Sequence, residues 1–198
     1  MSTIRQKKLW LLPFLALLLL AADALLLGRD GAIHVDGAGV GFPAFRTESL
    51  DGRVVTDEIF AGKTTAVCVW TVHDAETSRA SLKHLAAIAE GLPENAQFIG
   101  LVGDLKIEDG AEKRAMAKAI AADGSAIFPQ LLINDDFMPF LTRLRSAPTI
   151  VFIDSAGRLV GQPVVGDEPE LVRKEFFRLI EKDSPRSLAL KKIQKALF

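Results

Sequence analysis

Two short runs of apolar residues, each followed by a helical pattern, constrain the fold of this chain more than any other feature. Thr65–Trp70 and Phe98–Gly103 lack the polar alternation of half-exposed strands. Such runs are typical of strands that are buried on both faces of a sheet. Apolar residues recur at three- and four-residue spacing over 75–90, and 112–122 is rich in alanine, lysine and methionine, so we expect a helix after each strand. This order of elements predicts parallel βαβ units.

The rest of the chain predicts antiparallel additions to these units. Thr149–Asp154 and Arg158–Gln162 are two strands of a hairpin, joined by a Ser-Ala-Gly turn. Residues 168–182 place their apolar side chains on one face of a helix, which can pack on the sheet. Near the N-terminus, Phe45–Thr47 and Val54–Thr56 flank an Asp-Gly turn and predict an opening hairpin. The elements together predict an α/β fold with a central mixed sheet flanked by helices.

An N-terminal apolar segment predicts export. Arg5, Lys7 and Lys8 precede the run Leu9–Leu27, whose roughly 19 residues would extend about 28 Å as a helix, close to the thickness of a bilayer core. We interpret this run as a transmembrane helix. The alternative is a cleaved secretory signal, because Ala22-Asp23-Ala24 is a small-x-small site. Positive charge before the run places the rest of the chain outside the cytoplasm in either case.

The predicted organisation therefore has five parts. We expect a single-pass protein of the cell membrane with a periplasmic C-terminal domain, or a secreted protein if the signal is cleaved. In chain order, the parts are a cytoplasmic basic n-region at 1–8, the anchor or signal at 9–27, a glycine-rich linker at 28–41, the folded domain at 42–182 and a basic amphipathic tail at 183–198.

Charge and cysteine content narrow the range of functions. The formal net charge is -1 and the pI is about 6.3, so no basic field would draw the protein onto nucleic acid. The one cysteine, Cys68, cannot form an intramolecular disulfide. It lies inside a predicted buried strand, where burial should raise its pKa. We therefore expect a structural residue rather than a nucleophile.

Four segments carry a resemblance to a known family. They are the turn Ser49-Leu-Asp-Gly52, the strand that ends at Trp70, Phe128-Pro129-Gln-Leu-Leu132 before a short helix, and Ala147-Pro-Thr-Ile-Val-Phe-Ile-Asp-Ser-Ala-Gly-Arg158. In this order and spacing they resemble the membrane-anchored thioredoxin-like proteins of the TlpA/ResA type, within the redoxin (AhpC/TSA-like) group. The last segment is similar to that family's Val-Pro-Thr-Thr-Phe-Leu-Ile-Asp-x-x-Gly-Arg. The resemblance covers about Val40 to Lys182 and implies a thioredoxin-like fold.

The chain departs from this family at the redox motif. The family places Trp-Cys-x-x-Cys where a strand ends and a helix starts, which falls here on His73, Asp74, Ala75, Glu76 and Thr77. Asp74 and Thr77 occupy the two cysteine positions, and neither a carboxylate nor a hydroxyl can carry out dithiol exchange. Asp74 is instead expected to cap the helix. A metal site at His73, Asp74 and Glu76 is an alternative, but only two of these could face one ion, so we expect no metal and no other cofactor.

The resemblance also implies a role for Ala147 and Pro148. In thioredoxin-like folds the matching proline is cis and flanks a groove where an extended segment of a partner pairs with the backbone of the preceding residue, here Ala147. Such pairing needs no thiol. The alternative is that Pro148 only preserves the fold and contacts no partner. We therefore predict a non-catalytic binding or assembly module for an exported or membrane protein, not an active disulfide oxidoreductase. Two alternatives are a thiol-disulfide oxidoreductase that acts through Cys68 or a partner's thiol, and a structural subunit of a membrane complex.

Overall fold

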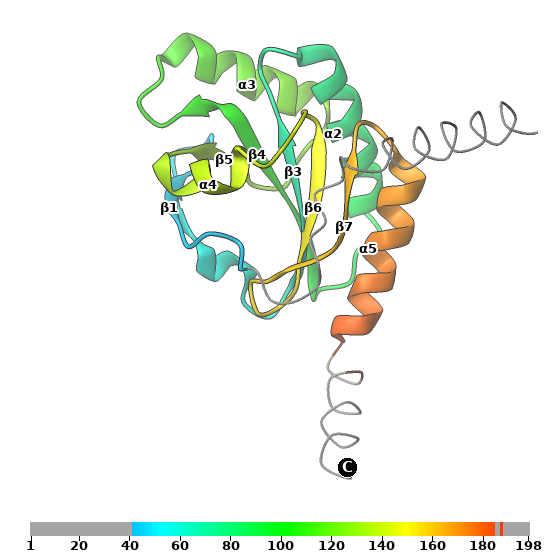
Figure 1. Ribbon diagram of the computed structural model, residues 1–198. Helices are drawn as coiled ribbons and strands as arrows, with labels where there is room; N and C mark the ends of the chain where they lie inside the picture. Colours follow the sequence, from blue (N-terminus) through cyan, green and yellow to red (C-terminus); the bar gives the residue numbers. More distant parts are fainter. Residues whose placement is uncertain (1–40, 185–186, 188–198) are drawn as a thin grey trace, which may run out of the picture. The chain divides into compact units, whose positions relative to one another are not determined.

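A computed structural model describes residues 41–184 and 187 of the 198-residue chain (Figure 1). The predicted membrane anchor, the linker before Gly41 and the tail from Leu188 onward lie outside the described residues. Among the residues that are described, no helix is long and apolar enough to cross a membrane. The elements in chain order are β1 (Arg46–Glu48), β2 (Val54–Thr56), η1 (Asp57–Phe60), β3 (Thr64–Trp70), α2 (Ala75–Ala89), β4 (Ala96–Lys106), α3 (Ala111–Asp123), β5 (Gln130–Ile133), η2 (Asp135–Phe137), α4 (Met138–Leu141), β6 (Thr149–Ile153), β7 (Leu159–Val165) and α5 (Pro169–Asp183).

A five-stranded mixed sheet in the order β5-β4-β3-β6-β7 forms the centre of the fold. β3, β4 and β5 run parallel to one another, whereas β6 is antiparallel to β3 and β7 is antiparallel to β6. All seven residues of β3 are buried, because this strand has neighbours on both edges and packed layers on both faces. The predicted βαβ units and the C-terminal hairpin are confirmed.

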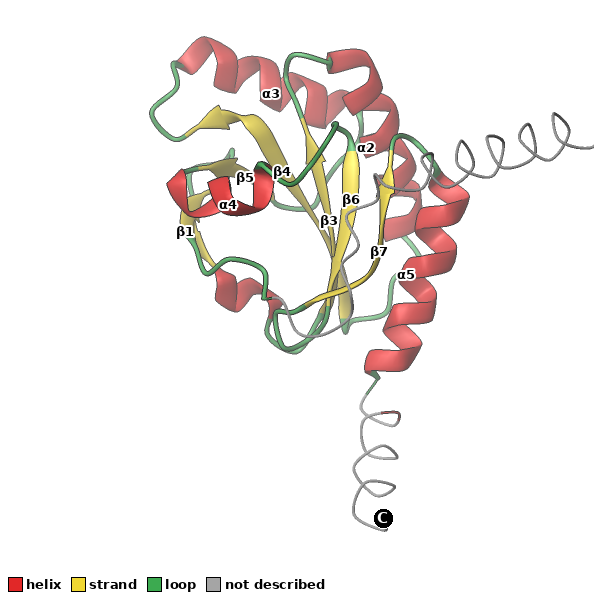
Figure 2. Cartoon of the chain, in the orientation of Figure 1, coloured by secondary structure: helices red, strands yellow, loops and turns green. Residues whose placement is uncertain are grey.

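Helices cover the two faces of the sheet unequally (Figure 2). On one face, α2, α3 and α5 contribute Leu85, Ile120 and Phe176 to a core that also contains Cys68. The opposite face is covered by the N-terminal segment, η1, η2 and α4. Their aromatic rings form one packed cluster, which consists of Phe42, Phe45, Phe60, Phe137 and Phe140. The alternation of side chains along β3 thus places Cys68 under the long helices.

Part of the strand assignment needs correction. Gln130–Ile133 is a strand, β5, although the sequence suggested only a segment that leads into a short helix. β4 continues to Lys106, beyond the predicted end at Gly103, and β7 continues to Val165. The opening hairpin is confirmed but forms its own two-stranded sheet. Its turn lies against β5, where the Leu50 N–H donates to the Gln130 carbonyl at 2.8 Å, so this hairpin closes the edge of the main sheet.

A buried polar contact orients Trp70, the last residue of β3. Its Nε1 donates to Oε1 of Gln130 at 2.8 Å, and Nε2 of Gln130 donates to the carbonyl of Phe128 at 3.0 Å. The Gln130 side chain occupies the space over Gly100, where an added Cβ would lie 1.8 Å from Oε1. Gly100 in β4 therefore makes room for the hydrogen bond that fixes Trp70, three residues before the predicted motif begins at His73.

Candidate functional site

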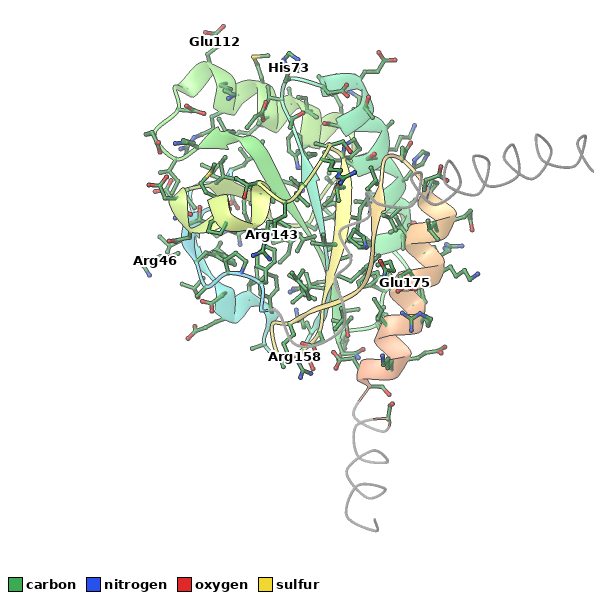
Figure 3. The ribbon with its side chains drawn as sticks, in the orientation of Figure 1. Arg46, His73, Glu112, Arg143, Arg158 and Glu175 are labelled. Atoms are coloured by element: carbon green, nitrogen blue, oxygen red, sulfur yellow. The ribbon has the colours of Figure 1, made fainter. Side chains whose placement is uncertain are left out.

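The predicted motif and the proline loop meet at one end of the sheet. Val69 of β3 pairs with Thr149 of β6 in antiparallel register, so the chain that leaves β3 passes beside the chain that enters β6. The peptide bond between Ala147 and Pro148 is cis, as the resemblance implied. Figure 3 shows His73 at this end of the molecule. The structure thus brings both predicted parts of the site to the same edge.

The backbone of Ala147 is open at this edge. Its neighbours are bonded, since the Pro148 carbonyl accepts from the Gly166 N–H at 2.9 Å and the Ser146 carbonyl accepts from Thr149 Oγ1 at 2.7 Å. No hydrogen bond within the described residues uses the N–H or the carbonyl of Ala147 itself. An added extended segment can pair with a residue beside a strand when both the N–H and the carbonyl of that residue are unpaired.

The helix α2 begins with a capped turn. Asp74 is the residue before the helix, and its Oδ1 accepts from the Thr77 N–H at 3.4 Å. This confirms the predicted cap. The side chains of His73, Asp74 and Glu76 are exposed, whereas Ala75 and Thr77 are half-buried. The helix start therefore presents imidazole and carboxylate groups at the surface.

Side chains, not strands, hold the loop between β3 and α2. Four consecutive backbone N–H groups donate to side-chain oxygens: Thr71 to Ser78 Oγ (3.2 Å), Val72 and His73 to the two carboxylate oxygens of Asp104 (2.8 and 3.0 Å), and Asp74 to Thr71 Oγ1 (3.3 Å). Sequence reasoning missed both Ser78 and Asp104. A signal for Asp104 was present, because an acidic residue directly after a buried parallel strand lies at the carboxyl edge of the sheet, where sites occur in α/β folds.

No thiol lies at this edge. Cys68 is the one cysteine of the chain, and its side chain has no exposed surface. It is flanked in the sheet by Gly100 and Ile150. Burial in the core raises the pKa of the Cys68 thiol to about 12, and the negative charge of Asp167 adds to the effect. The thiol is therefore neutral at physiological pH and out of reach of a substrate.

Two further kinds of site concern this end of the sheet, a metal site and a pocket. The described residues contain no group of three histidine, cysteine or acidic side chains that could hold a metal ion. A pocket of about 440 Å³ opens beside Asp104, between the end of β4, the start of α3 and α4. Ile133, Met138 and Leu141 form its apolar wall, and Lys113 lies at its rim. This pocket is large enough to hold one or two side chains.

Comparisons with known proteins bear on the fold. Neither protein-family models nor curated protein sequences give a match. Similar solved structures include a DsbF homologue from Corynebacterium diphtheriae, with a TM-score of 0.58 and 16% identity over 74% of this chain and 92% of that one. A thiol:disulfide interchange protein of the thioredoxin family from Chlorobium tepidum has a TM-score of 0.55 and 18% identity, over 75% of this chain and 99% of that one. The exposed lipoprotein thioredoxin Etrx1 of Streptococcus pneumoniae has a TM-score of 0.56 and 21% identity, over 69% and 99% respectively. At these identities the likeness shows the fold alone.

Proposed function

We propose, from the thioredoxin-like fold of this chain, that it is a membrane-anchored, extracytoplasmic module that binds a partner protein and does not exchange disulfides with it. The chemistry at the start of α2 carries this proposal. Asp74 and Thr77 stand where a relative of the TlpA/ResA type would have cysteines, and Cys68 is buried in β3. Thiol-disulfide exchange needs an accessible thiolate and a thiol that resolves the mixed disulfide, and this edge offers neither.

The open backbone of Ala147 supports a binding role. Both hydrogen-bonding groups of this residue are unused within the described part of the chain, and they lie next to the cis Ala147–Pro148 bond. A partner segment in extended conformation can donate to the Ala147 carbonyl and accept from its N–H, as in other cases of strand addition. The exposed His73 side chain and the pocket beside Asp104 would supply side-chain contacts to the same segment.

The proposed location rests on the N-terminal sequence. The basic residues before the apolar run Leu9–Leu27 would keep the N-terminus in the cytoplasm and the folded domain outside. The partner would then be an exported protein or the exported part of a membrane protein. A chain held at the membrane meets such a partner at a high effective concentration, so even weak pairing at Ala147 would be sufficient.

Site-specific photocrosslinking in the native membrane tests this proposal. A photoreactive amino acid is placed in the full chain at Ala147, at His73, or at Met116, a half-exposed residue on α3 that serves as the control. We expect one discrete adduct from both site positions and none from the control position. The adduct should persist when all thiols are alkylated beforehand, because backbone pairing does not depend on sulfur.

Two outcomes would count against the proposal. An adduct that disappears after alkylation would indicate that a thiol holds the partner. The absence of an adduct at both Ala147 and His73 would leave this edge unused, and would favour a structural subunit that contacts its complex through other surfaces.

A thiol-disulfide oxidoreductase is the second candidate. The observation in its favour is that the similar solved structures include a thiol:disulfide interchange protein and a secreted disulfide oxidoreductase from Mycobacterium tuberculosis. In this chain such an activity would need Cys68 to leave the core, or a partner that contributes both thiols. Turnover of insulin by the purified exported domain would favour this candidate.

A further inference from the structure

The pairing of β4 with β5 is interrupted next to the candidate site. Val102 pairs with Leu132 of β5, but the next pair is Lys106 with Ile133, so Gly103–Leu105 leave the ladder as a bulge. Bulges of this kind redirect side chains and are common beside functional sites.

Residues on both sides of Asp104 fix the shape of this bulge. Leu105 is completely buried in the core under the long helices. Gly103 lies close to β3, where an added Cβ would be 3.1 Å from Cγ1 of Val69. The carbonyl of Asp104 accepts a hydrogen bond from Nζ of Lys113, in the first turns of α3. Figure 3 shows Glu112, the neighbour of Lys113, at the same end of the molecule as His73. The bulge is thus anchored from the core, from β3 and from α3.

The bulge directs Asp104 to the loop before α2. Pairing between β3 and β4 ends at Trp70 and Val102, so no strand supplies acceptors for the next N–H groups of the loop. The two carboxylate oxygens of Asp104 accept from the N–H groups of Val72 and His73, at 2.8 and 3.0 Å. These bonds have an ionised acceptor and are stronger than bonds between neutral groups.

We propose that Asp104 is the positioning residue of the partner-binding edge: it fixes the backbone at Val72 and His73, and so presents His73 and the capped start of α2 beside the open peptide unit of Ala147. This inference deepens the proposed function and rests on it. Asp104 also lines the pocket described above, but both of its carboxylate oxygens are occupied by N–H groups of the loop. It acts by holding the loop in the bound conformation before the partner arrives, which reduces the entropy lost on binding.

Asp104→Asn is the informative substitution. The amide keeps one acceptor oxygen but points its NH₂ group at a backbone N–H, so one of the two hydrogen bonds is lost at almost constant side-chain volume. Asp154→Asn is the matched control. Asp154 also accepts from two backbone N–H groups, those of Ala156 and Arg158 (both 3.0 Å), but it follows β6 at the opposite end of the sheet from the loop before α2.

The experiment combines hydrogen exchange with crosslinking from Ala147 in the full chain in its native membrane. In Asp104→Asn we expect roughly tenfold faster exchange at the Val72 or His73 amide, as the loss of one charge-assisted hydrogen bond would produce. We also expect severalfold less of the wild-type Ala147 adduct per folded molecule, measured well below the melting temperature. Asp154→Asn should match wild type in both measurements.

The outcomes separate this inference from the proposed function. Wild-type and Asp104→Asn adducts of equal yield would show a purely structural role for Asp104, and unchanged exchange at both amides would show that Asp104 does not hold the loop. Either result overturns the inference while the proposed function stands. If the wild-type chain itself gives no adduct at Ala147, the proposed function fails and the positioning role fails with it.

Discussion

Asp74 shows how a single residue can stabilise the start of a helix. A thiolate at this position would interact favourably with the N-terminal N–H groups and the dipole of α2, and the Asp74 carboxylate meets the same groups with a fixed charge. Asp74→Ala should lower stability by about 0.5–2 kcal/mol, which corresponds to a fall of a few degrees in melting temperature for a domain of this size. Thermal unfolding followed by circular dichroism measures this.

Glu76→Ala is the control for this substitution. Glu76 lies in the first turn of the same helix and carries the same charge, but it makes no cap hydrogen bond. Its replacement should change the melting temperature less than Asp74→Ala does. Equal effects from the two substitutions would mean that charge near the helix start matters and the cap hydrogen bond does not.

The Cys68 thiol should not react with alkylating reagents in the folded protein. Because its thiol is fully buried and its pKa is raised to about 12, native protein should not react with iodoacetamide at pH 8 within hours, whereas the unfolded chain should react within minutes. Mass spectrometry after a timed quench measures the labelled fraction. Rapid labelling of the native protein would show that the thiol reaches the surface.

Burial of Cys68 also predicts a pH dependence of stability. The folded-state pKa lies above the ordinary value of 9.0, so this group's contribution is complete below pH 9. As the pH rises from 9 toward 12, the unfolded chain loses the proton first and the contribution is lost. Cys68→Ser is not a suitable comparison because it buries a hydroxyl, so Cys68→Ala is the reference. The difference in unfolding free energy between wild type and Cys68→Ala should be constant below pH 9 and should shift against wild type above it.

At the scale of elements, the contact between β4 and β5 supports the strand that leads to the site. Gly100→Ala would place a methyl group on Gln130 Oε1, displace that side chain and leave the buried Trp70 N–H without an acceptor. A buried donor without a partner costs about 1–3 kcal/mol, so Gly100→Ala should be clearly destabilising in chemical denaturation. Gly91→Ala is the control, because its nearest neighbouring atom would be 3.9 Å away. A Gly100→Ala protein as stable as the control would contradict the proposed packing of Gln130.

The elements differ in how much of their structure can be read from the sequence. β3, α2, α3, α5 and both hairpins follow from local patterns, because each has its own apolar periodicity or turn residues. β5 has only four residues after a proline, and its status as a strand depends on pairing with β4. The bulge at Gly103–Leu105, and with it the role of Asp104, depends on the register between two strands that are distant in the chain. Such features become visible only when the sheet is assembled.

For the molecule as a whole, the order and spacing of the segments indicate which parts of the chain meet. The approach strand, the helix start and the segment around Ala147 and Pro148 are far apart in the chain, yet one sheet topology brings them to one edge. The open backbone of Ala147 agrees with the pairing role that the resemblance implied, but residue patterns alone do not predict it, since it depends on which neighbouring groups pair with Gly166 and Thr149. The membrane anchor at Leu9–Leu27 stays a prediction from hydrophobic length and flanking charge.

Insulin reduction by the purified domain of residues 42–182 tests the central claim most directly. In the presence of dithiothreitol, the wild-type domain should cause no precipitation of the insulin B chain above the rate of the reagent alone, because Asp74 and Thr77 cannot form a mixed disulfide. The double variant Asp74→Cys and Thr77→Cys places a dithiol at the start of α2 and should accelerate the reaction. Acceleration by the wild-type domain, to a rate comparable with that of the double variant, would contradict the account.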